Sequence, residues 1–155
     1  ATCIMGQMRT LYADWQVQRI IDEVVEPYQS DVFLVVSPDN ASYEVLKRLE
    51  KKNATRIISD GSEKKNFRYD HHFKVLSLEE VASRFAAKAI RIYGGRPSAK
   101  ENHTCKHRSY NFYHSSFWTL KVCHELVTTY EKANKFQYDW IVKQRTDVAY
   151  GFWPR

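Results

Sequence analysis

Apolar residues along the chain form short continuous runs, and stretches of helical spacing lie between these runs. Four apolar runs have the length and composition of short buried strands: 2–5, 31–36, 55–59 and the first part of 138–148. Four other stretches repeat apolar residues every three or four positions, as an amphipathic helix does: 15–26, 41–52, 78–92 and 115–133. Strands that alternate with amphipathic helices are typical of a parallel sheet with right-handed crossovers.

Finer features of this pattern predict where helices begin and end. Pro27 ends the first helix, and the segment Ser37-Pro38-Asp39-Asn40 offers an N-cap for the second. Gly94-Gly95 closes the helix over 78–92. A further strand, on a partly exposed edge, is expected over 72–76. The residues expected to form the core stripe of the long helix are Phe117, Leu120, Cys123, Val127 and Tyr130.

The sequence therefore predicts an α/β fold. We expect a three-layer α/β/α, Rossmann-like domain with a mainly parallel sheet, spanning residues 1–155 as a single unit. A chain of 155 residues is long enough to bury a sizeable core in one domain. Because it opens directly on strand-like residues, we expect it to be a segment of a longer protein, so that missing targeting signals carry little information.

Composition narrows the classes of partner. A net charge of +6 favours anionic partners such as nucleotides, phosphates, nucleic acid or acidic membrane. The chain has neither a block of Lys and Arg that resembles a nucleic-acid tail nor an apolar run that could span a bilayer. A G-x-G-x-x-G loop and a P-loop are both absent from the sequence, which disfavours dinucleotide, ATP and GTP sites.

The cysteines and the glycosylation sequons bear on the cellular compartment. Three cysteines without a C-x-x-C pair indicate neither a zinc site nor a redox motif. The odd number argues against a simple disulfide framework, although one bridge, for example Cys105 to Cys123, stays open. Three Asn-x-Ser/Thr sequons, at Asn40, Asn53 and Asn102, favour the secretory pathway.

Candidate chemistry gathers at the ends of the first and last predicted strands. The stretch that begins at Tyr138 ends in Arg145-Thr146-Asp147, which offers a cation and an oxygen ligand. Ligands of open α/β sheets bind just outside the carboxyl ends of the strands, although a salt-bridged strand terminus would have the same composition. At the end of the first strand, Gly6-Gln7 would let the backbone approach a ligand closely, and Arg9 could meet a phosphate.

A basic segment at 96–110 offers a second candidate for anion binding. It contains Lys106 and Arg108 and leads into the long helix. These side chains could form an anion cradle beside the sheet, or they could be ordinary solvated surface.

Several of these segments occur together in one family. They are Cys3-Ile4-Met5-Gly6-Gln7-Met8-Arg9-Thr10, then Ser30-Asp31-Val32-Phe33-Leu34-Val35, the helix with Trp118 and Tyr130-Glu131, and Tyr138-Asp139-Trp140-Ile141-Val142-Lys143-Gln144-Arg145-Thr146-Asp147-Val148. The combination resembles the nucleotide-sugar-binding part of GT-A type glycosyltransferases. It is closest to sets whose metal-motif strand reads Tyr-Asp-x-x-(Val/Ile)-(Arg/Lys)-x-Arg-x-Asp, and it covers essentially the whole chain.

The resemblance implies a nucleotide-diphosphate sugar as donor, with a glycan, protein or lipid as acceptor. Asp147 falls where the last carboxylate of the family's D-x-D element would bind Mn²⁺ or Mg²⁺, and Arg145 stands in the place of the first acidic residue. Gly6, Gln7 and Arg9 fall where the first strand faces the nucleotide, and Lys106 and Arg108 are further candidates for holding the diphosphate. For a eukaryotic protein the resemblance also implies the lumen of the Golgi or of the secretory pathway. It further implies a donor-binding part without its acceptor-binding part.

A second hypothesis comes from another functional class. The chain could be a non-catalytic, Rossmann-like module that binds nucleic acid or another anionic partner through its basic loops. A signature of interleaved basic and aromatic strand residues, which would favour RNA, is absent from the sequence. Convergence of Asp147, Arg145 and Gly6 on one concave site would favour the glycosyltransferase hypothesis.

Overall fold

The protein is built around a four-stranded parallel sheet. The computed structural model describes residues 1–51, 57–58, 67–68, 73–94 and 108–146. The strand order is β5-β2-β1-β6, and every neighbouring pair is parallel. The strands are β1 (Thr2–Gln7), β2 (Val32–Ser37), β5 (Ala89–Ile92) and β6 (Val142–Arg145).

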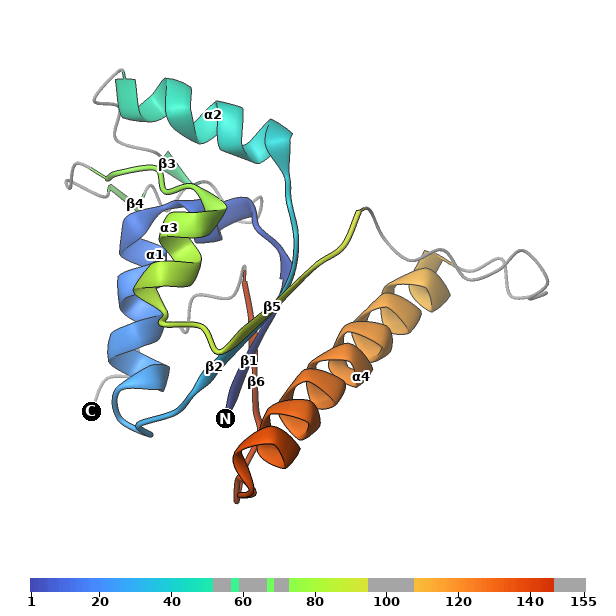
Figure 1. The fold of residues 1–155 in the computed structure, drawn as a ribbon. Helices are drawn as coiled ribbons and strands as arrows, with labels where there is room; N and C mark the ends of the chain where they lie inside the picture. The colour runs from blue at the N-terminus through green and yellow to red at the C-terminus, as the bar shows by residue number, and fades with distance from the viewer. Residues whose placement is uncertain (52–56, 59–66, 69–72, 95–107, 147–155) are drawn as a thin grey trace.

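Helices cover both faces of this sheet and so form three layers (Figure 1). One face carries the short helix η1 (Arg9–Tyr12), α1 (Asp14–Ile20) with its π-helical continuation η2 (Ile21–Val25), and α3 (Leu78–Arg84). The long helix α4 (Arg108–Asn134) covers the other face, and α2 (Asn40–Lys51) follows β2. The predicted α/β fold with a mainly parallel, Rossmann-like sheet is therefore confirmed.

Alternation along the strands divides the core into two clusters. Ile4 and Leu34 point to the side of α1 and α3, whereas Cys3, Met5 and Phe33 point to the side of α4. β2 is buried at every position, as a strand covered on both faces must be. This explains why its continuous apolar run was readable in the sequence.

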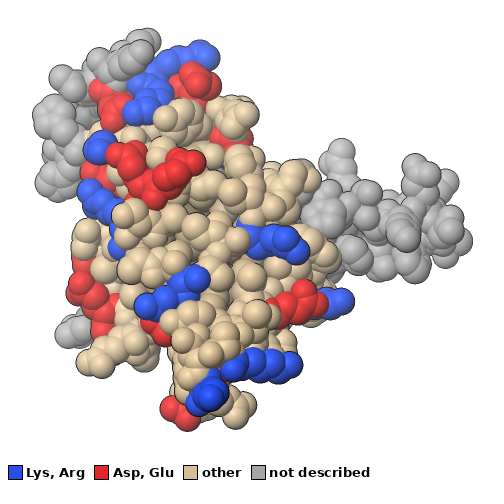
Figure 2. All heavy atoms as spheres, in the orientation of Figure 1, with Lys and Arg blue, Asp and Glu red and all other residues tan. Residues whose placement is uncertain are grey.

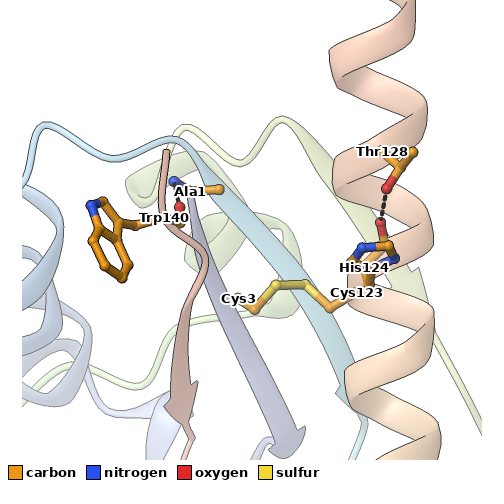
Figure 3. The surroundings of a disulfide bond; sticks show 6 residues. All are labelled: Ala1, Cys3, Cys123, His124, Thr128 and Trp140. Atoms are coloured by element: carbon orange, nitrogen blue, oxygen red, sulfur yellow. Dashed lines mark hydrogen bonds between the residues drawn. A yellow bond between two sulfur atoms is a disulfide. The ribbon is translucent and has the colours of Figure 1, made fainter. Parts of the chain in front are cut away.

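A disulfide bond joins the first strand to the long helix. Cys3 and Cys123 are separated by 120 residues, their Cα atoms lie 6.1 Å apart, and both side chains are fully buried. Figure 3 shows the bond running from Cys3 on β1 to Cys123 on α4. The bridge between Cys105 and Cys123 that was left open is therefore wrong, because Cys123 is bonded to Cys3; Cys105 lies outside the described residues.

The predicted helix over 78–92 is wrong in its second half. The helix begins with a capping box at Ser77 and Glu80, but it ends at Arg84, and Ala86 has a φ of +46°. The Lys88 N–H then donates to the Val32 carbonyl at 2.8 Å, and residues 89–92 pair with β2 as β5. Residues 89–92 therefore pair with the free edge of β2 as a strand, although their apolar spacing also suits a helix.

Two other strand predictions need correction. Within 55–59, Ile57–Ile58 (β3) pairs antiparallel with Phe67–Arg68 (β4) in a separate two-stranded sheet, because β5 occupies the place beside β2. Within 72–76, Val75 forms one antiparallel bridge with Ala13 instead of an edge strand of the main sheet. Residues 55–56, 59 and 72 lie outside the described part of the chain.

The last strand is shorter than 138–148, and its start is exposed. Only Val142–Arg145 pairs with β1, and Trp140 is 81% exposed. Tyr138 is held elsewhere: its hydroxyl donates to Asp31 at 2.5 Å, and its N–H donates to Glu131 at 2.9 Å. These bonds anchor the segment before β6 at the amino end of the sheet.

The core stripe of α4 was also predicted only in part. Cys123 and Val127 are fully buried and Tyr130 packs beside them, but Phe117 is 68% exposed and Leu120 is 37% exposed. With about 100° per residue, Phe117 lies roughly 120° around the helix from Cys123. The disulfide turns Cys123 toward β1 and therefore turns Phe117 away from it.

Glu50 fastens α2 to the segment before α3. Its carboxylate accepts the Val75 N–H at 2.7 Å and the Lys47 ammonium at 3.1 Å, and Lys47 also donates to the Val75 carbonyl at 3.3 Å. The bond from the Val75 N–H, followed by the bond from Lys47, lowers the pKa of Glu50. The contact between α2 and the segment before α3 is therefore strongest when the Glu50 carboxylate is ionised.

We expect loss of the disulfide to be costly. A covalent loop of this length restricts the unfolded chain by roughly 5 kcal/mol, so the double variant Cys3→Ala, Cys123→Ala should lose about 3–5 kcal/mol of unfolding free energy. Urea denaturation followed by circular dichroism measures this loss. Adding reductant to the wild type should produce a comparable loss, and an unchanged urea midpoint in both cases would show that the bond does not stabilise the fold.

We also expect Glu50 to contribute to acid sensitivity. Its folded pKa is lowered, so its stabilisation is complete above the unfolded value of about 4.3 and is lost as the pH falls through the lower folded value. Glu50→Gln should therefore lose less stability than the wild type between pH 6 and pH 3, which urea midpoints at each pH would measure. Glu44→Gln, an exposed change of equal charge on the same helix, is the control and should follow the wild type.

Candidate functional site

The sheet reverses its strand order between β1 and β6. From β1 the chain crosses through α1 to β2 and then reaches β5, and it returns through α4, on the opposite face, to the other side of β1. In open α/β sheets, crossovers on opposite faces generally leave a crevice outside the carboxyl ends of the two strands at such a point, and ligands bind there. We call the residues at the carboxyl ends of β1, β2 and β6, with the η1 turn, the carboxyl edge.

Gly6 and Thr146 form the floor between β1 and β6. Gly6 has a φ of +132°, and a Cβ atom added to it would lie 2.8 Å from the Thr146 hydroxyl oxygen. That hydroxyl donates to the Gln7 carbonyl at 2.5 Å, and the Thr146 N–H donates to the Met5 carbonyl at 3.3 Å. The absence of a side chain at Gly6 therefore lets β6 approach β1 this closely.

The η1 turn is tied to the same floor. The Thr10 hydroxyl donates to the Thr146 carbonyl at 3.1 Å, and the Met8 N–H donates to the Ser37 carbonyl at 2.9 Å. The turn that carries Arg9 is therefore connected to the ends of β6 and β2. The bond between Thr10 and Thr146 joins residues that are 136 positions apart in the sequence.

Arg9 and Asp39 form an ion pair at the end of β2. The Arg9 Nε atom lies 3.8 Å from an Asp39 carboxylate oxygen, and the Arg9 side chain is 47% exposed. Asp39 also caps α2, because it accepts the Ser42 N–H at 3.1 Å and the Ser42 hydroxyl at 3.0 Å. The carboxylate thus compensates the positive end of the α2 dipole, and Arg9 compensates the carboxylate.

Tyr12 supports this pair from the core side. Its hydroxyl oxygen accepts the Asp39 N–H at 3.2 Å, and its ring packs edge-on against Tyr43 at a centroid distance of 5.0 Å. Burial raises the pKa of Tyr12, and the bond from Asp39 opposes part of that shift. The residue therefore stays a neutral hydrogen-bonding group at physiological pH.

The structure brings together four of the predicted site residues. Gly6 and Gln7 end β1, Arg145 ends β6 beside them, and Arg9 lies in the turn bonded to Thr146 through Thr10. Arg145 is exposed and pairs in register with Met5, so it projects from the face that α4 covers. Arg108 is the first residue of α4, but its side chain lies outside the described part of the structure. Lys106 and Asp147 lie outside the described residues altogether.

Sequence reasoning missed the residues that organise the carboxyl edge. Thr10 and Thr146 stand in the segments quoted for the resemblance but were given no role of their own, and Tyr12 was not singled out. Their contacts join segments that are distant in the sequence, so no local pattern predicts them. Asp39 did carry a signal, since the segment around it predicts a helix N-cap. Its pairing with Arg9 follows only from the parallel pairing of β1 and β2.

The described residues supply only part of what a divalent cation needs. Among them, no three His, Cys, Asp or Glu side chains gather closely enough to hold a metal ion. At the carboxyl edge they contribute one carboxylate, Asp39, which is engaged by Arg9 and by the α2 cap. A hard cation prefers several oxygen ligands, so Asp147 and the oxygens of a bound diphosphate would have to complete the set.

The surface charge is mixed on the face that Figure 2 shows. Lys and Arg side chains lie among Asp and Glu side chains there and do not form one continuous basic surface. Nucleic-acid binding without sequence specificity depends on such a continuous basic surface. In the described part of the chain, no helix combines the length and apolar character needed to cross a membrane.

We expect Gly6→Ala to destabilise the protein by about 1–3 kcal/mol. The alanine must adopt a positive φ, and its Cβ must displace the Thr146 hydroxyl. Gly94→Ala is the matched control, because nothing lies within 4 Å of its added Cβ and its φ is not positive, so it should change stability by less than about 0.5 kcal/mol. Urea midpoints compare the two variants, and equal midpoints would contradict the proposed floor.

The chain matches no protein-family model, no curated protein and no solved structure. What the carboxyl edge can do chemically must follow from its own residues. These include a glycine packed against Thr146, two guanidinium groups, one carboxylate that is already paired with Arg9, and hydroxyl and amide groups that hold the surrounding turns in place. Such a set is suited to binding an anion rather than to transferring a proton.

Proposed function

We propose that this domain binds the diphosphate of a nucleotide-sugar donor at its carboxyl edge and serves as the donor-binding part of a glycosyltransferase. The observation that carries the proposal is the reversal of the strand order between β1 and β6, where Gly6 near the end of β1 and Arg145 at the end of β6 lie on neighbouring strands. The resemblance of the strand motifs to GT-A glycosyltransferases supports the same conclusion.

Gly6 and Arg145 contribute in different ways to anion binding. The missing side chain of Gly6 lets the Thr146 hydroxyl approach the end of β1, and this contact fixes how closely the carboxyl ends of β1 and β6 lie beside the proposed ligand. Arg145 presents an always-charged, planar donor at the end of β6, and such a group suits a phosphate with two parallel hydrogen bonds. Gln7 is the last residue of β1, and it supplies a further polar side chain at the carboxyl edge.

Arg9 is available to the same ligand at low cost. Its pair with Asp39 is long, at 3.8 Å, and its side chain is 47% exposed. An exposed pair of this kind contributes only about 0–1 kcal/mol. A diphosphate carries more negative charge than the carboxylate, so Arg9 can exchange Asp39 for the ligand while Asp39 keeps its role as the cap of α2.

Asp147 is the residue we propose for the divalent cation, Mn²⁺ or Mg²⁺. It follows Thr146 directly in the chain, and the Thr146 hydroxyl donates to the Gln7 carbonyl at the end of β1. When bound, such a cation would stabilise the negative charge that develops on the leaving diphosphate. Arg145 and Arg9 would share this task by donating hydrogen bonds to the same oxygens.

We further propose that the domain works in the lumen of the secretory pathway, such as the Golgi. The fully buried bond between Cys3 and Cys123 supports this, because structural disulfides form and persist in oxidising compartments. The sequons at Asn40, Asn53 and Asn102 agree with the same compartment.

We expect Arg145→Ala to weaken the binding of uridine or guanosine diphosphate by about tenfold, because one charge-assisted contact is lost. Calorimetric titration at several salt concentrations should also show a weaker salt dependence. Lys143→Ala is the matched control, because Lys143 is exposed and carries the same charge. It lies on the same face of β6, two residues before Arg145 and therefore further from the carboxyl end of the strand. Equal losses in the two variants would indicate only a general charge effect.

The same titrations test the cation. Asp147→Asn keeps the size of the side chain and removes its charge, so the enhancement of affinity by Mn²⁺ over chelator should disappear, while the contribution of Arg145 remains. Equal enhancement in the wild type and in Asp147→Asn would exclude Asp147 as the ligand. Failure of both nucleotides to bind the wild type, with or without Mn²⁺, would contradict the proposed function.

A further inference from the structure

The sequon Asn40-Ala41-Ser42 agrees with the proposed compartment but has no part in binding the nucleotide. It lies at the start of α2, directly after the carboxyl end of β2. The Asn40 side chain is exposed. An acceptor amide on the surface can carry a bulky, hydrophilic group without displacing any part of the core.

The local structure of α2 does not depend on the Asn40 side chain. Asp39 provides the N-cap through its bonds to the Ser42 N–H and hydroxyl, and the Tyr43 N–H donates to the Asp39 carbonyl at 3.0 Å as the first bond of the helix. The cap therefore survives modification of the neighbouring amide. This separates the two residues: Asp39 determines where the helix begins, and Asn40 faces the solvent.

The disulfide supplies an independent indication of compartment. A buried bond between residues 120 positions apart indicates folding in an oxidising lumen, which is where asparagine-linked glycans are attached. The bond also sets an order of events, because Cys123 follows Ser42 by 123 − 42 = 81 residues. At about 5–20 residues per second, the sequon would be accessible for roughly 4–16 s before Cys123 is even synthesised.

We propose that Asn40 is a site of asparagine-linked glycosylation. The Asn40 Nδ2 atom forms a bond to the anomeric carbon of an oligosaccharide carried on a polyprenyl diphosphate. The bond from that carbon to the diphosphate oxygen breaks, the diphosphate leaves with the electron pair, and the amide gives up one proton. The glycan then stands at the β2 side of the carboxyl edge, and two strand spacings, about 10 Å, separate β2 from β6.

The proposal is independent of the proposed nucleotide site, and peptide mapping tests it. The chain is secreted from eukaryotic cells behind a cleavable signal sequence, treated with peptide N-glycosidase in heavy-oxygen water and digested. We expect the peptide that contains Asn40 to carry heavy-oxygen aspartate at that position. Asn134 is exposed but lies outside any sequon, so its peptide must stay unlabelled and reports spontaneous deamidation in the same digest.

A second variant keeps the test clear. Asn40→Gln leaves the Asp39 cap intact and should remove one glycan increment from the intact mass, whereas Ser42→Ala would also remove the cap. If Asn40→Gln is not secreted, the labelling of the wild type decides alone. An unlabelled Asn40 in secreted protein whose Cys3 and Cys123 peptides are disulfide-linked overturns the proposal, and so do free thiols at Cys3 and Cys123.

Discussion

The position of α4 depends on the covalent bond between Cys3 and Cys123. On the other face of the sheet, α1, η2 and α3 share a large apolar cluster with β1 and β2. On the side of α4 the described cluster is smaller, and the outward side of the helix exposes Phe117 and Leu120. A helix with so narrow a buried stripe gains little from packing alone. The bond fixes its rotation and thereby fixes the crossover that brings β6 to β1.

The sequence predicted the parts of the fold that local pattern determines. β1 and β2 were found because strands covered on both faces are apolar at nearly every position, and α2 was found from its spacing and its cap. β5 was missed because Ala89 to Ile92 fits a helix or a strand equally well, and the free edge of β2 decides between them. The partner of Cys123 was also missed because it depends on tertiary structure: nothing near Cys3 in the sequence indicates which helix will pack against it.

The candidate site shows the same division. Gly6 and Arg145 were identified because strand ends are visible in the sequence. Two contacts hold the surroundings of these residues together: Thr146 bonds to Gln7, and Arg9 pairs with Asp39. Both contacts join segments that are brought together only by the pairing of the strands. A single sequence records the composition of each strand end, whereas the pairing of strands determines which ends meet.

The covalent ring closed by Cys3 and Cys123 contains β1, β2 and β5, and β6 is the strand of this sheet that lies outside it. Local opening of a native protein follows the segment that can separate with the fewest interactions broken. β6 is an edge strand, so it can separate from β1 while the ring stays intact, whereas β1 cannot leave without unfolding the ring. The two walls of the crevice therefore differ in kind: the wall that carries Gly6 is fixed, and the wall that carries Arg145 can fluctuate. A ligand that bridges both walls would suppress this fluctuation, and part of its binding free energy would be spent on ordering β6.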